Sequence, residues 1–270
     1  MVAVASLAVL ALLALTMIEA TRGSTRSARA ELDRARLTAA ADAGVALAVQ
    51  GLAQASASRR WRPDGEARAV SFEGARLEIR IEDESGKISL NAINSQQVEA
   101  LLAAFGLQGA ELEEARDAFL DWRDQDELPR PRGREREDYE ADGVRPRDGR
   151  LRSNGELAAI PAIGPALAAR MDPFVTVYAP DRLEFDPTHA SALARRVMVE
   201  TEFEDQLDGV AVVEGGLTEE LSGSVEDGVT GRPLRVIVTA RGEDGAAARR
   251  DVVIELTGNP ARPFVVRGRN

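Results

Sequence analysis

The chain has 270 residues, and its 34 lysines and arginines against 45 aspartates and glutamates give a formal net charge of −11 at pH 7. This excess of acid disfavours binding to nucleic acid, which is itself a polyanion. The absence of cysteine excludes disulfides and thiolate metal sites, whereas a hydrophobic content of 44% is enough for a substantial core.

The chain begins with an apolar run, residues 1–18, that contains no charged side chain. At the rise of an α-helix this run is close to the length that crosses the hydrocarbon of a bilayer. We favour a retained membrane helix over a cleavable signal peptide, because no basic segment precedes the run and no clear cleavage site follows it. The side chains expected in the membrane include Val2, Leu7, Leu10, Leu13 and Ile18.

The pattern after the apolar run first continues a helix and then changes to strands. Residues 25–58 lack proline and carry small or apolar residues at helical spacing, so one helix is expected to continue beyond the membrane. Val70 and Phe72, followed by Leu77, Ile79 and Ile81, alternate with polar residues and predict a strand hairpin.

Helical spacing returns between residues 94 and 122 and predicts two helices, and a further helix is expected at 188–199. Short strands are predicted at 174–178, 234–240 and 251–256, and an acidic, glycine-containing loop at 202–232. This order predicts an α+β fold of pilin-like plan: a long N-terminal helix packs on an antiparallel sheet that carries an inserted all-helical domain. The expected parts are a membrane helix at 1–22, a first part of the body at 23–91, the inserted domain at 92–174, and a second part of the body at 175–270.

Residues 157–171, LAAIPAIGPALAARM, have the outline of a helical hairpin that holds a DNA phosphate on free backbone N–H groups. Ala162 stands where such a turn needs its first glycine, and Pro165, after Gly164, has no N–H to donate. Pro165 suits the first position of a helix, and the apolar residues around it suit a helix–helix junction. We therefore favour a packing role and expect no nucleic-acid partner; a membrane-anchored DNA-binding protein is the alternative function.

An enzyme is a further class to consider, and the residues that it needs are sparse. His189 is the only histidine, and the chain offers neither a cysteine nor a recognisable serine elbow as its partner. We expect no catalytic residue and no small-molecule substrate.

The segment 121–150 contains ten acids, eight arginines and three prolines with almost no aliphatic residue, so we expect that it cannot form a core. A loop of this length is usually either functional or disordered. Asp121, Asp124 and Asp126 bring carboxylates together where a helix ends, and Glu135 and Asp138 return after prolines and a glycine have turned the chain. A set of oxygen ligands suits a structural calcium ion. Asp124, Asp126 and Glu135 are the leading candidates, and a solvated loop neutralised by its own arginines is the alternative.

Four stretches carry a resemblance to a known family, namely residues 83–91, 121–139, 153–164 and 175–194. With the N-terminal helix, they resemble the K subunit of the type II secretion system, a minor pseudopilin. The resemblance implies a non-enzymatic, single-pass protein of the bacterial inner membrane with its body in the periplasm. It further implies a place at the tip of the pseudopilus beside the I and J subunits, a role in protein export across the outer membrane, and calcium sites in the inserted domain. No acid precedes Glu19, where most pseudopilins have an early glutamate, which suits a subunit with no neighbour above it.

Overall fold

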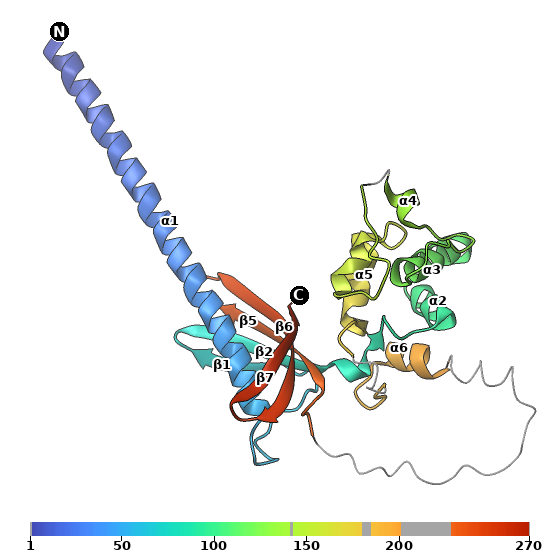
Figure 1. Ribbon diagram of the computed structural model, residues 1–270. Helices are drawn as coiled ribbons and strands as arrows, with labels where there is room; N and C mark the ends of the chain where they lie inside the picture. The colour runs from blue at the N-terminus through green and yellow to red at the C-terminus, as the bar shows by residue number, and fades with distance from the viewer. Residues whose placement is uncertain (1, 141–142, 180–184, 201–227, 270) are drawn as a thin grey trace, which may run out of the picture. The chain divides into compact units, whose positions relative to one another are not determined.

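The computed structural model describes residues 2–140, 143–179, 185–200 and 228–269 (Figure 1). Its α-helices are α1 (Val2–Leu52), α2 (Ser95–Ala104), α3 (Gly109–Arg123), α4 (Arg136–Tyr139), α5 (Gly164–Met171) and α6 (Ala192–Arg195). Its strands are β1 (Arg68–Phe72), β2 (Ala75–Asp83), β3 (Ile88–Ser89), β4 (Val175–Thr176), β5 (Pro233–Arg241), β6 (Ala247–Asn259) and β7 (Arg262–Arg269). The chain forms two compact units, one of Met1–Trp61, Glu66–Arg80 and Val236–Arg250, the other of Arg62–Gly65, Ile81–Arg235 and Asp251–Asn270.

In the first unit, the C-terminal half of α1 lies along the strands (Figure 1). Its buried face follows helical spacing and consists of Leu37, Ala40, Ala41, Ala48, Val49 and Leu52. Small residues let the backbones approach closely, since a Cβ added at Gly44 would lie 2.5 Å from Cγ1 of Val238. The helix therefore packs through small residues interspersed with larger apolar ones.

The main sheet has five strands in the order β1-β2-β5-β6-β7. Strands β1 and β2 pair antiparallel across a tight turn, with Phe72 opposite Ala75, and both residues of that turn, Glu73 and Gly74, have positive φ angles. A two-residue turn with positive φ angles matches the right-handed twist of the two strands that it joins. The predicted hairpin and the predicted closing strands thus belong to one sheet, and β7, which the pattern did not predict, pairs antiparallel with β6 at its edge.

Within the second unit, helices α2, α3 and α5 surround a core made of residues from Ile88 to Val197. Helix α2 begins with a reciprocal capping box between Asn94 and Gln97, which satisfies two backbone donors. The parallel pair β3–β4 sets Ile88 beside Val175, so the chain enters and leaves the helical segment at neighbouring positions.

Part of the charged segment belongs to this core. Tyr139, in α4, is fully buried and meets Trp122 edge-on, with ring centroids 5.7 Å apart. Leu151, just beyond the segment, is also buried. The sequence predicts only that the segment cannot form a core by itself, and in the structure Trp122 and Tyr139 attach it to the core of the helices.

Other boundaries also differ from the prediction. The helix expected at 188–199 is confined to α6 and a following π-helical turn, Arg196–Glu200, and the strand expected at 174–178 contains two residues. Most of the acidic loop expected at 202–232 lies outside the described residues.

The predicted α+β class is confirmed by the long helix, the sheet and the helical segment. The predicted part boundaries at 22, 91 and 174 stay predictions. No helix among the described residues has the length and hydropathy of a membrane span.

Candidate metal centre in the charged segment

Helix α3 ends at the beginning of the charged segment and orients its first acid inward. Asp121, in the last turn, is fully buried and accepts a hydrogen bond from the Arg130 backbone N–H at 3.1 Å. The Arg130 guanidinium binds the same carboxylate. A Cβ at Gly133 would collide with the Asp121 side chain, so the chain can double back this closely only with glycine there.

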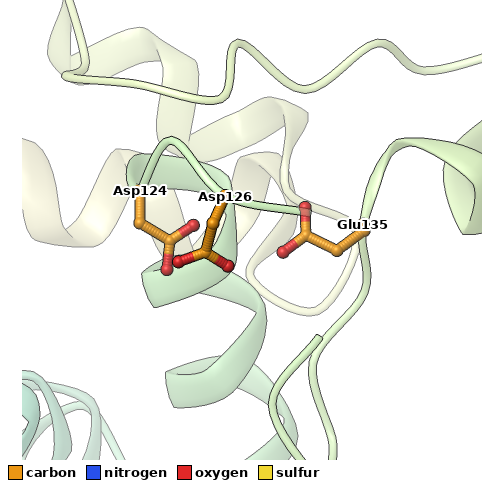
Figure 2. Close-up of side chains that lie close together, drawn as sticks. All are labelled: Asp124, Asp126 and Glu135. Atoms are coloured by element: carbon orange, nitrogen blue, oxygen red, sulfur yellow. The ribbon is translucent and has the colours of Figure 1, made fainter. Parts of the chain in front are cut away.

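This reversal brings together three carboxylates, those of Asp124, Asp126 and Glu135 (Figure 2). One oxygen from each lies within 4.8 Å of the others. Asp124 and Asp126 follow the end of α3, whereas Glu135 lies on the returning part of the loop. Glu135 is buried, Asp124 is half-buried and Asp126 is exposed, so the cluster opens to solvent on the Asp126 side.

The most unusual member of the cluster is Glu135, which is only 5% exposed. Neither of its carboxylate oxygens has a hydrogen-bond partner among the described residues, and Oδ1 of Asp124 is in the same condition. Burial, together with the charges of Asp121 and Asp124, raises the pKa of Glu135 from 4.5 to about 7. A buried carboxylate in this position is stabilised either by a proton or by a cation.

Asp121 and Asp138, the other two predicted ligands, lie outside this group of three and have partners of their own. Asp121 binds Arg130, and burial raises its pKa while the arginine opposes that rise. Asp138 is exposed and accepts a hydrogen bond from the Glu135 backbone N–H at 3.0 Å. Both residues hold the loop in shape, and Asp138 fixes the backbone from which Glu135 projects.

Arginines pair with Asp124, a member of the cluster, and with acids beside the cluster. Nη1 of Arg130 lies 2.6 Å from Oδ2 of Asp124, and Arg136 pairs with Asp148 and with Glu127. The pattern of acids pointed to the three carboxylates but not to Arg130, because any of eight arginines in the segment was an equally good partner in the sequence. In the structure the partner is Arg130, because this arginine binds the buried Asp121.

The contact between Trp122 and Tyr139 was not predicted. These two residues bracket the loop in the sequence, and burial raises the pKa of Tyr139 to about 12. The signal for this contact was available, since Tyr139 is the only aromatic residue of the segment after Trp122.

The hairpin at 157–171 has the packing role that we favoured. The N–H groups of Ile163 and Gly164 both donate to the Ile160 carbonyl, at 2.9 and 2.8 Å, and Pro165 occupies the first turn of α5. Ile160, Ile163 and Leu167 are buried in the core. Two of the turn's donors are thus already used and a third is missing, which gives DNA binding no support.

His189 lies in a group of polar side chains together with Asp186 and Arg232. Its Nδ1 lies 2.8 Å from Oδ2 of Asp186, which also binds Arg232 at 2.7 Å. Arg232 in turn pairs with the buried Asp83 at 2.9 Å. These contacts tie residues that are distant in the sequence to one another.

In the comparison with protein families, residues 76–181 match the model described as type II secretion system (T2SS), protein K. We call these residues the protein K domain. This domain contains α2 to α5 and all three carboxylates of the cluster, and it confirms the predicted resemblance.

Among solved structures, the protein K domain and the rest of the chain resemble a chain from "The Crystal Structure of the GspK-GspI-GspJ complex from enterotoxigenic Escherichia coli Type 2 Secretion System". The TM-score is 0.66 at 14% identity, and the match covers 90% of this chain and 98% of that one. At this identity the likeness shows the fold, which is the predicted pilin-like plan. No curated protein sequence matches the chain.

Proposed function

We propose that this protein is a minor pseudopilin of the type II secretion system that supports protein export across the outer membrane by assembly rather than by catalysis. The observation that carries the proposal is the protein K domain, in a chain whose fold follows a solved chain of the GspK-GspI-GspJ complex over nearly its whole length.

The partners that we propose are the I and J minor pseudopilins. Residues 27–36 of α1 are exposed on every side, so this stretch of helix is free to pack against helices of other subunits. Co-expression of the full chain with tagged I and J subunits tests the proposal: we expect all three to co-purify. Isolation of the chain without either subunit, under conditions in which I and J still bind each other, would count against it.

We also propose that residues 1–22 anchor the protein in the inner membrane and that the body lies in the periplasm. The support is the uncharged run at residues 1–18. Alkaline extraction should leave the full chain in the membrane fraction and release a variant that lacks residues 1–22. A C-terminal reporter that is active only in the periplasm should be active; an inactive reporter on a stable fusion would contradict the orientation.

The third part of the proposal is a structural calcium ion held by Asp124, Asp126 and Glu135. The fit rests on the unpartnered oxygens of Glu135 and Asp124, which need a positively charged partner. Calcium accepts six to eight oxygen ligands in flexible geometry, and water can complete a set that opens to solvent.

Thermal melting of the full chain tests the calcium site. Because a ligand that binds only the folded state stabilises it by RT ln(1 + [L]/Kd), calcium at a hundred times Kd should add about 2.7 kcal/mol. We expect the melting temperature to rise with millimolar calcium and to fall again with chelator. Asp126→Asn should reduce the rise, whereas Glu137→Gln, at an exposed neighbouring acid, should not. An unchanged melting temperature in the wild-type chain would leave the acids as a solvated loop.

A further inference from the structure

Arg130 lies between the buried end of α3 and the carboxylate cluster. Its guanidinium Nη1 bonds to Oδ1 of Asp121 and lies 2.6 Å from Oδ2 of Asp124. Its backbone N–H separately donates to the other oxygen of Asp121. The side chain thus reaches from the cluster to the helix, while the backbone bond fixes the loop independently of the side chain.

The charge of Arg130 neutralises the cluster only in part. The three carboxylates of the cluster and Asp121 carry four formal negative charges, and the guanidinium, which binds Asp121 and Asp124, supplies one positive charge. Among the described residues, Oδ1 of Asp124 and both oxygens of Glu135 have no hydrogen-bond partner. The negative charge that remains attracts a divalent cation, but such a cation would have to share Asp124 with the arginine and would be repelled by it.

We propose that Arg130 is an internal counter-cation that lowers the affinity of this site for calcium and holds the loop in shape without metal. The inference rests on the proposed calcium site. Because coupling between two equilibria is reciprocal, the contact between Arg130 and Asp124 weakens calcium binding by the same factor by which bound calcium weakens that contact. The site is then tuned to respond to calcium concentration rather than to stay permanently filled.

The neighbouring arginines do not share this position. Arg132 also contacts α3 but at other acids, since its side chain lies 2.6 Å from Glu113 and its backbone N–H donates to Asp117. Arg132→Gln therefore removes an equal charge from the same loop without touching Asp121 or Asp124. It is the matched control for Arg130→Gln.

Isothermal titration of the full chain with calcium tests the proposal. We expect Arg130→Gln to bind calcium about tenfold more tightly than wild type, a change of about 1.4 kcal/mol, and to melt at a lower temperature without calcium. Arg132→Gln should keep the wild-type affinity. Arg130→Lys, which retains the charge, should lie nearer to wild type than Arg130→Gln does.

Equal or weaker binding by Arg130→Gln, beside a wild-type chain that binds calcium, would overturn this inference and leave the calcium site intact. Absence of binding in both chains would instead overturn the calcium site, and the inference with it. If Arg130→Gln unfolds without metal, calcium release from its folded, loaded form is measured after mixing with chelator. Release about tenfold slower than from wild type supports the proposal, and equal or faster release overturns it.

Discussion

A carboxylate that is buried without a partner destabilises the fold that contains it, and Glu135 is such a residue. Its backbone N–H is held by the Asp138 carboxylate, which fixes the position from which the side chain projects. The residue therefore keeps a position that is unfavourable for the metal-free protein and suited to a cation.

The raised pKa of Glu135 makes the stability of the metal-free protein depend on pH. Because the folded state holds this proton up to about pH 7 and the unfolded chain releases it near 4.5, stability should fall as pH rises through that window. In calcium-free buffer at pH 7.5, Glu135→Gln should be more stable than wild type by about 1–3 kcal/mol, with the difference much smaller at pH 4.5. Urea unfolding at both pH values measures this.

The control is Glu137→Gln, which changes an exposed acid two residues away. It should reproduce the wild-type dependence on pH. If Glu135→Gln did the same, the carboxylate would not be the group responsible. With calcium present the order should reverse, since the glutamine variant lacks a charged ligand.

At this scale, the sequence predicted which acids meet because their spacing places Asp124 and Asp126 at a helix end and returns Glu135 after a turn. It ranked Asp121 below these three acids, but the spacing of Asp121 is equally favourable and gives no structural reason for that rank. The difference is burial: Asp121 points into the protein and selects Arg130, and burial depends on how α3 packs rather than on local spacing.

At the scale of elements, α1 and β5 pack closely because residue 44 of α1 is a glycine, which has no side chain. Gly44 lies in the middle of a helix, where glycine costs about 1 kcal/mol relative to alanine. The structure gives the reason for this choice, because the Val238 side chain occupies the space that a Cβ would need. The close approach of β5 thus outweighs the low helix propensity of glycine at this position.

Gly44→Ala should therefore destabilise the protein by about 1–3 kcal/mol despite its better helix propensity. In the double variant with Val238→Ala, the second change makes room for the new methyl group. The loss should then be smaller than the sum of the two single losses. Chemical denaturation of the four proteins measures the coupling, and simple additivity would show that the two side chains do not compete.

The pattern identified most elements correctly where one face of an element is buried, as in β2, whose residues alternate between buried and less buried positions. It failed for β7, an edge strand that is mostly exposed and whose Arg-rich sequence shows weak alternation. It also failed for α4, where Tyr139 alone anchors a turn. Strand β7 is fixed by pairing with β6 and α4 by the contact of Tyr139 with Trp122, and neither contact appears as a periodic pattern within the element itself.

At the scale of the molecule, the proposed assembly needs a surface that the chain does not cover itself. Residues 27–36 of α1 provide one, and Leu32 is its most evident apolar contact, at 60% exposed. An exposed leucine on a bare helix costs little in the free subunit and gains burial when another helix packs against it.

Leu32→Asp should reduce co-purification with the I and J subunits severalfold without lowering the melting temperature of the isolated protein. Ala30→Asp introduces the same charge two positions earlier, on the opposite side of the helix, and should have a smaller effect. Quantitative pull-down from co-expressing cells measures both. Equal loss in the two variants would indicate a general effect of charge, and no loss in either would remove this stretch from the interface.

The pairing of Ile88 with Val175 has a consequence for the order in which the chain folds. Strand β2 ends at Asp83 and its neighbour β5 begins at Pro233, so these strands meet only after a long intervening chain has been gathered. The entropy lost on closing a loop grows with its length, and distant pairings form slowly for that reason. When the helical segment folds, the pairing of β3 with β4 brings its two ends together and shortens the effective loop between β2 and β5. Folding of this segment should therefore precede and accelerate completion of the sheet.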